Sequence, residues 1–182
     1  MTRVLTGLLI MTMAAANGHA ALTVERPVHV TFGAGIGYPQ IPLSQFRPPI
    51  AITGTLGIQW RPMNKWALSG SANALRTFSL GTITAEKAHL KFDMIWGSLN
   101  LEYVISGDFN RKSFLCVGSG LYRLDRQIDQ ETDQVKTPGL SLAFVTHTVL
   151  IKYASAFRVT WHLLFRPSDQ PQILTLTLGI LL

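Results

Sequence analysis

The last ten residues of the chain carry an aliphatic side chain at every second position. These aliphatic residues are Leu174, Leu176, Leu178, Ile180 and Leu182, and the residues between them include Thr175, Thr177 and Gly179. Successive side chains of a β-strand point to opposite faces, so this period of two predicts a strand with one apolar face. Similar stretches recur along most of the chain, which predicts an all-β fold.

The first twenty residues have a different pattern, which is typical of a secretory signal peptide. Arg3 supplies a positive charge, residues 4–16 form an apolar stretch without charge, and Gly18-His19-Ala20 offers small residues for cleavage after Ala20. A membrane anchor is disfavoured because the apolar stretch is too short to cross about 30 Å of hydrocarbon. We therefore expect a signal peptide at residues 1–20 and one folded domain at residues 21–182.

Eight strand-like segments are predicted within this domain. They cover residues 28–37, 50–60, 66–74, 90–105, 114–124, 140–149, 157–165 and 173–182. In the fourth segment the apolar residues change phase between Trp96 and Leu99. A strand that inserts one extra residue shifts its alternation in this way, so we expect a β-bulge at Gly97-Ser98.

The connections between these segments alternate in length. Short connections follow the second, fourth and sixth segments, and the longest follow the first, third and fifth, at residues 38–49, 75–89 and 125–138. In this scheme the prolines fall in connections or at strand starts, where no ladder hydrogen bond is lost. An even number of strands with long loops at one end is typical of transmembrane barrels. The pattern predicts an eight-stranded antiparallel up-and-down transmembrane β-barrel.

Charge content separates a membrane barrel from a soluble one. Only 14% of the residues are charged, whereas a soluble surface usually holds roughly 25–35%. The charged residues well inside predicted strands are Lys91, Asp93, Glu102 and Arg158. We therefore expect the apolar faces outside and the small polar faces in a narrow lumen. The alternative, a soluble periplasmic lipocalin-like carrier, needs the opposite arrangement.

Aromatic residues near the predicted strand ends support the membrane interpretation. Transmembrane barrels carry girdles of aromatic side chains at both membrane interfaces. The residues that we expect to form such girdles are Trp60, Trp66, Tyr103, Phe114 and Phe165.

Two segments resemble the small outer-membrane β-barrel domain family, which includes the OmpA-, OmpX- and OmpW-like barrels. They are residues 115–123 (LCVGSGLYR) and 176–180 (LTLGI). The resemblance implies a location in the cell outer membrane, contact with outer-membrane lipid and lipopolysaccharide, and insertion by the barrel-assembly machinery. Members of this family typically end on an aromatic residue that helps insertion, and this chain departs from that pattern at Leu182.

A group of polar residues falls on the predicted lumen face: Asp93, Glu102, His147, Arg158 and His162. Two histidines, two carboxylates and an arginine could form a reactive site, but small barrels are also filled by paired polar side chains. Buried charges must be paired, so we interpret the group as a lumenal plug and predict an ion pair between Glu102 and Arg158.

An enzymatic alternative is a lipid A deacylase-like barrel that modifies lipid. Such enzymes are built on a histidine and a serine two residues apart, because the nucleophile needs a base within hydrogen-bond reach. Val149 follows His147 at that spacing and Leu164 follows His162, so neither histidine has the hydroxyl. We predict no catalytic residue, metal or cofactor, and expect a structural or interaction role, or passage of a small molecule.

The remaining charge pattern indicates no nucleic-acid partner. The chain carries a net charge of +6, but its basic residues are dispersed rather than gathered in a run or stripe. An acidic segment containing Asp125, Asp129, Glu131 and Asp133 lacks the glycine and the closing glutamate of a calcium-binding loop. The long loops therefore remain the expected place for any unidentified ligand.

Overall fold

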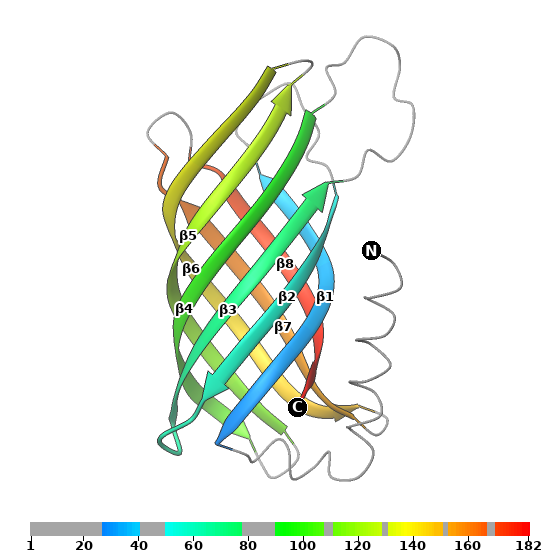
Figure 1. The fold of residues 1–182 in the computed structure, drawn as a ribbon. Helices are drawn as coiled ribbons and strands as arrows, with labels where there is room; N and C mark the ends of the chain where they lie inside the picture. The colour runs from blue at the N-terminus through cyan, green and yellow to red at the C-terminus, as the bar shows by residue number, and fades with distance from the viewer. Residues whose placement is uncertain are drawn as a thin grey trace.

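The computed structural model describes residues 27–40, 50–77, 90–107, 111–128, 131–150, 153–166 and 170–182. These residues form a closed barrel of eight strands in sequence order (Figure 1). The strands are β1 (Val28–Gln40), β2 (Ala51–Trp60), β3 (Trp66–Thr77), β4 (Leu90–Gly107), β5 (Arg111–Ile128), β6 (Glu131–Leu150), β7 (Tyr153–Leu164) and β8 (Gln172–Leu181). The predicted signal peptide at residues 1–20 lies outside the described residues.

Antiparallel pairing of β1 with β8 closes the barrel. The ladder runs from Thr31 opposite Leu181 to Gln40 opposite Gln172. Beyond it, Val30 and Leu182 exchange two backbone hydrogen bonds of 3.1 and 2.9 Å. Closure gives the backbone groups of both strands partners inside the sheet, as a hydrocarbon environment requires. The predicted eight-stranded antiparallel up-and-down barrel is confirmed.

No stretch of helix in the described part of the chain has the length and hydropathy that a bilayer crossing requires.

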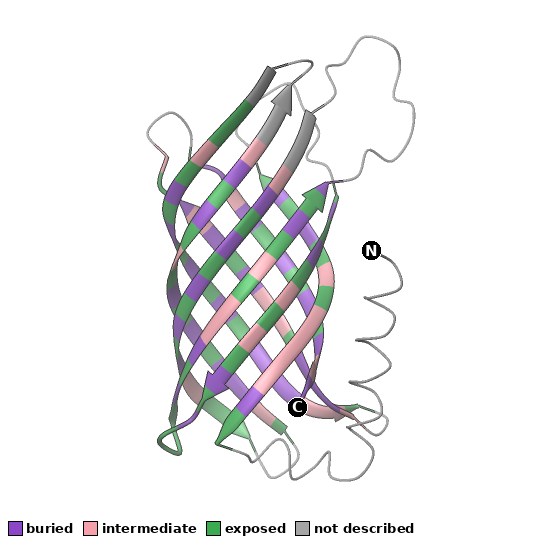
Figure 2. Cartoon of the chain, viewed as in Figure 1, coloured by how far each residue is buried: buried purple, intermediate pink, exposed green. Residues whose placement is uncertain are grey.

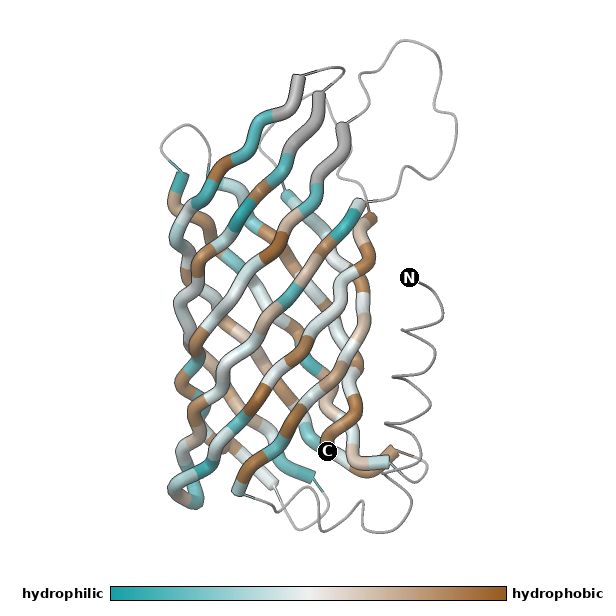
Figure 3. Tube along the Cα trace, viewed as in Figure 1, coloured by the Kyte–Doolittle hydropathy of each residue, from teal (hydrophilic) through white to brown (hydrophobic). Residues whose placement is uncertain are grey.

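The alternation of β8 places its aliphatic residues on the outside of the barrel. Leu174 and Leu178 are 44% and 51% exposed, whereas Thr175 and Thr177 are 3% and 7% exposed and face the lumen. The same succession of buried and exposed residues follows the other strands (Figure 2), and brown hydrophobic segments recur along their length (Figure 3). Large apolar side chains on the outer face are the opposite of what the soluble-carrier alternative requires.

Aromatic side chains lie on the outer face near both ends of the barrel. Trp60 and Trp66 are exposed at the end with short turns, and the ring of Trp66 meets Tyr103 at a centroid distance of 4.8 Å. At the other end, the exposed aromatic residues are Tyr38, Trp161 and Phe165. Tyr38 lies ten residues beyond Val28, the partner of Trp60, which corresponds to a height of about 25 Å for a strand tilted by about 40°.

One predicted member of this girdle was wrong. Phe114 is fully buried and points into the lumen, where it packs with Cys116, Ala143 and Val145. The reason is that Cys116, Ala143 and Val145 form a local apolar cluster in this part of the lumen, which accommodates a strand-end aromatic residue on the inner face.

The predicted β-bulge at Gly97-Ser98 was also wrong. The pairing of β4 with β3 and with β5 continues without interruption through both residues. Met94 and Trp96 are buried in the lumen, and Leu99 and Leu101 are exposed outside. The apolar phase changes because the upper lumen is apolar, and not because the strand slips. The register of β4 shifts elsewhere, between Val104 and Ser106.

The predicted long loop at residues 125–138 is instead mostly strand. β5 extends to Ile128 and β6 begins at Glu131, with Asp125 opposite Gln134. Figure 1 shows the ends of β4, β5 and β6 rising above the other strands as a projecting wall. A strand outside the membrane needs no apolar face, so its sequence carries no alternation of apolar and polar residues and looks like a loop.

Two prolines that we expected in connections lie inside strands. Pro39 is opposite Ile173 in β1, and Pro138 belongs to β6. The carbonyl of Pro138 accepts a 3.0 Å hydrogen bond from the Phe165 amide. Proline has no amide hydrogen to return that bond, and the Thr137 hydroxyl donates to the Phe165 carbonyl at 2.6 Å in its place.

Candidate functional site

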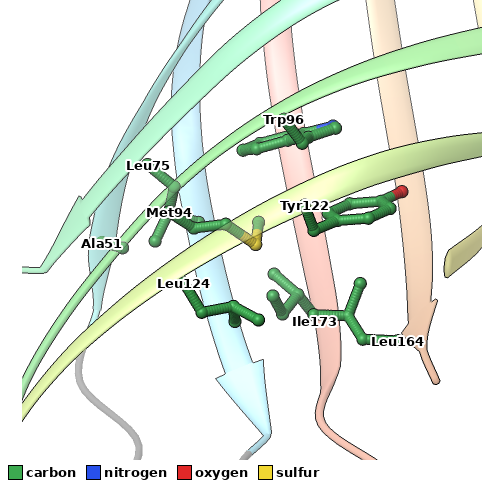
Figure 4. Close-up of a cluster of buried hydrophobic side chains, with 8 residues drawn as sticks. All are labelled: Ala51, Leu75, Met94, Trp96, Tyr122, Leu124, Leu164 and Ile173. Atoms are coloured by element: carbon green, nitrogen blue, oxygen red, sulfur yellow. The ribbon is translucent and has the colours of Figure 1, made fainter. Parts of the chain in front are cut away.

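The upper lumen is filled by a cluster of apolar side chains (Figure 4). It consists of Ala51, Leu75, Met94, Trp96, Tyr122, Leu124, Leu164 and Ile173. The rings of Trp96 and Tyr122 stack with a centroid distance of 6.0 Å. These residues come from β2, β3, β4, β5, β7 and β8, so their side chains meet across the barrel and occlude its loop-bearing end.

The centre of the lumen holds the predicted ion pair between Glu102 and Arg158. Glu102 is fully buried on β4, and Nη2 of Arg158 donates to its Oε1 at 3.0 Å. β4 and β7 are not neighbours in the barrel, so the pair spans the lumen. Gln59 Nε2 and Ser69 Oγ also donate to the carboxylate. Breaking such a buried pair typically costs about 3–5 kcal/mol, because one charge is left uncompensated.

A network of small polar side chains extends from this ion pair. Asn100 donates to Ser69 at 3.3 Å and accepts from Ser141 at 3.2 Å. Ser71 and Ser98 are linked at 2.9 Å. The network joins β3, β4 and β6. The sequence predicted small polar residues in the lumen but not this hydrogen-bond network. Serine and asparagine at alternate positions indicate a polar face, and they do not indicate which residues of different strands bond to each other.

His162 is held in the lumen by two hydrogen bonds. Its Nδ1 lies 3.0 Å from the Tyr122 hydroxyl, and its Nε2 lies 3.3 Å from the hydroxyl of Thr175. Its ring also meets the edge of Trp96 at a centroid distance of 5.1 Å. All four side chains are buried. The hydroxyls of Tyr122 and Thr175 are therefore both within hydrogen-bond distance of His162, and both lie in the packed lumen.

His147 lies lower in the lumen, near the end with short turns. Its ring meets His29 at 5.6 Å and Phe114 at 4.9 Å between centroids. The Arg61 guanidinium carbon lies 5.2 Å from the centre of the Phe114 ring, which is a cation–π geometry. Side chains from β1, β5 and β6 therefore pack together here, with a cation from the adjoining turn.

The structure places Asp93 outside the lumenal group, so this part of the prediction was wrong. Asp93 shares the outward phase of Ile95 and pairs with Arg76 at 3.8 Å near the loop-bearing end. The error arose from the expected bulge at Gly97-Ser98, which placed the residues of β4 that precede it on the wrong face of the barrel. The lumenal group therefore comprises Glu102, His147, Arg158 and His162.

A small cavity of about 40 Å³ lies between the ion pair and His147. Gln59, Ser69, Glu102, His147 and Arg158 are among the residues that line it. It offers space for about three water molecules and is too small for a sugar or an acyl chain. Among the described residues, no group of three His, Cys, Asp or Glu side chains is arranged to hold a metal ion.

The projecting wall of β4, β5 and β6 carries charged residues on both of its faces. Arg123 on β5 is directly opposite Lys136 on β6, and both point outward. Asp125 accepts from Arg123 at 3.4 Å and from Gln134 at 2.7 Å. On the inner side of the wall, Arg166 donates to Asp133 at 2.9 Å. The acidic residues described here are therefore engaged by separate donors and do not converge on a common site.

Comparison with known proteins places this geometry in a fold class. Neither a protein-family model nor a curated protein sequence matches the chain. Solved structures do match, among them Neisserial surface protein A, with 10% identity and a TM-score of 0.60 over 85% of this chain and 97% of that protein. The chain has the fold of the small eight-stranded outer-membrane barrels.

Two further structures of this fold class support the assignment. The attachment invasion locus protein Ail of Yersinia pestis matches with 10% identity and a TM-score of 0.55, over 86% of this chain and all of Ail. The N-terminal barrel domain of Pseudomonas aeruginosa OprF matches with 7% identity and a TM-score of 0.50, over 84% and 97% of the two chains. At these identities the likeness extends to the barrel and not to individual side chains.

Proposed function

We propose that this protein is a non-catalytic barrel of the bacterial outer membrane that acts through its outer rim. The observation that carries the proposal is the contrast between the two parts of the barrel. The lumen is filled with packed apolar residues above and paired polar residues below, whereas the charged wall of β4, β5 and β6 projects beyond the other strands. A filled lumen stabilises the barrel, and the projecting wall is where a partner has access.

The filled lumen supports a structural role over passage of a small molecule. Eight strands enclose a space that side chains just fill, and the cavity beside Glu102 holds only about 40 Å³. The lumenal histidines His147 and His162 also favour this role. His162 lies within hydrogen-bond distance of the Tyr122 and Thr175 hydroxyls, and both histidines are buried. A lipid-modifying enzyme would need a base and a nucleophile that its substrate reaches.

For the rim we propose lipopolysaccharide of the outer leaflet as the partner. Ail has been crystallised with the heparin analogue sucrose octasulfate, a sulfated polyanion bound by a barrel of this fold. In the present chain the support comes from two exposed cations near the loop-bearing end, Arg123 and Lys136. Export by the signal peptide and insertion by the barrel-assembly machinery belong to the same proposal.

Three measurements test this proposal. Cells that express the chain are fractionated, and the membrane fraction is run on a gel with and without boiling. We expect an outer-membrane band whose mobility shifts on boiling, whereas a soluble periplasmic band would refute the location. In planar bilayers we expect no stepwise conductance, and stable steps would refute the filled lumen. The refolded barrel should bind lipopolysaccharide in neutral vesicles, and failure to bind would refute the role of the rim.

The unidentified ligand that we expected at the long loops stays a prediction. Two of those loops lie largely within residues 41–49 and 78–89, which are outside the described residues.

A further inference from the structure

The outer face of the barrel carries an apolar groove of about 650 Å³ that crosses strands β2 to β6. The groove exists because Gly70 and Ser119 are small, while Leu68, Leu99 and Leu140 beside them are large and exposed. Gly70, Leu99, Ser119 and Leu140 are successive cross-strand neighbours. Five strands at a spacing of about 4.8 Å make the groove about 19 Å long across the strands. It runs from Leu140 on β6 to Trp60 on β2, which lies near the end with short turns.

Two outward cations lie above the upper end of this groove. Arg123 and Lys136 are directly opposite each other, four residues along their strands from Ser119 and Leu140, which is a distance of about 13 Å. The backbone amide of the aromatic residue Phe165 donates a hydrogen bond to the carbonyl of Pro138, the next outward residue below Lys136 on β6. Because aromatic girdles lie at the headgroup level, the cation pair occupies the depth of lipid phosphates.

The charges on this pair favour a bound anion. Like charges directly opposite on one face of a sheet repel each other. Asp125 contacts Arg123 at 3.4 Å and also accepts from Gln134, so one carboxylate faces two cations. A phosphate placed between Arg123 and Lys136 would accept hydrogen bonds from both, and charge-assisted bonds to phosphate are among the stronger ones in proteins.

We propose that the Arg123–Lys136 pair and the groove below it form one binding site for a phosphorylated glycolipid of the outer leaflet. The phosphate binds the two cations, and one acyl chain descends past Leu121 into the space beside Ser119 and Gly70. This inference rests on the proposed function and adds the location of the site and the part of the lipid that each half holds. A phosphomonoester, with more than one negative charge, suits two adjacent cations better than a singly charged phospholipid does.

The test measures lipid retention by native mass spectrometry of the full barrel, refolded in neutral phospholipid vesicles that contain purified lipopolysaccharide. The cation half is removed by R123Q with K136Q, and R76Q on the same rim is the control. The groove is filled by Gly70→Leu, because a Cβ there would lie 3.5 Å from the Leu99 side chain and 4.0 Å from the Ser98 carbonyl, which are ordinary contacts. Gly54→Leu is the matched control, since Gly54 also faces outward and has nothing within 4 Å.

We expect R123Q with K136Q to lower lipopolysaccharide retention about tenfold, as the loss of one strong contact implies, and Gly70→Leu to lower it severalfold. Both controls should retain lipid like the unmodified chain, and phosphatidylglycerol should be retained less. If Gly70→Leu behaves like Gly54→Leu, the groove is not part of the site. If R123Q with K136Q behaves like R76Q while lipopolysaccharide still binds, the cation pair is not the site and the proposed function survives. If the unmodified chain retains no lipopolysaccharide, the proposed function itself fails.

Discussion

Replacing Arg158 with methionine removes the cation that neutralises the buried Glu102 carboxylate. The carboxylate has no exposed surface, whereas the arginine side chain is 24% exposed. Breaking a buried pair costs about 3–5 kcal/mol, and Gln59 and Ser69 still donate to the carboxylate in the variant. We therefore expect the lower end of that range, a loss of about 3 kcal/mol in the free energy of unfolding. For a domain of this size, this loss corresponds to a thermal unfolding midpoint lowered by about 6–12 °C.

The measurement is urea unfolding of the barrel refolded in phospholipid vesicles, followed by tryptophan fluorescence and by mobility on unboiled gels. A second variant, Glu102→Gln with Arg158→Met, removes both charges. Because no buried charge is then left uncompensated, we expect it to recover at least half of the lost stability. Arg123→Met on the outer face is the control and should cost less than about 1 kcal/mol. A change below about 0.5 kcal/mol for Arg158→Met would refute the reasoning, since the pair would then contribute nothing beyond a surface contact.

Three smaller perturbations test other parts of the structure by the same unfolding measurement. Thr137→Val should cost about 1 kcal/mol, because the Phe165 carbonyl loses the hydroxyl that substitutes for the missing amide of Pro138; an unchanged midpoint would contradict this substitution. Gly35→Ala should cost about 1–3 kcal/mol, because its Cβ would collide with the Leu176 carbonyl oxygen, whereas Gly54→Ala meets nothing within 4 Å and should not destabilise the barrel. Asp93→Asn should change stability by less than about 1 kcal/mol, because its 3.8 Å contact with Arg76 is partly exposed; a loss as large as that of Arg158→Met would return Asp93 to the buried group.

Several features followed from local patterns in the sequence. Alternation in β8 predicted both faces of that strand, and the low charge content predicted that the apolar face points outward. The pairing of Glu102 with Arg158 was predictable because the lumen of a narrow barrel leaves two isolated charges few other partners. Each of these inferences needs only the period of a strand and the cost of burying charge.

Other features depended on contacts between strands far apart in the sequence. Trp96, Tyr122 and Leu164 come from three strands and pack together in the upper lumen. Because of this packing, the apolar residues in the first part of β4 face the lumen, whereas those in its second part face outward. This is why the expected bulge at Gly97-Ser98 and the lumenal placement of Asp93 were wrong. The exposed placement of Phe114 was wrong because of a separate cluster, in which Phe114 packs with Cys116, Ala143 and Val145 from β5 and β6.

The sequence by itself determined the number of strands, because the period of two marks each one. It also predicted a closed antiparallel barrel with an apolar outer face, from that period together with the low charge content and the alternating length of the connections. Only the tertiary structure decided which side chains fill the lumen, how far β5 and β6 extend beyond the membrane, and which cations lie side by side at the rim. Those features depend on register between strands and on three-dimensional packing, and a period of two along one strand carries no information about either.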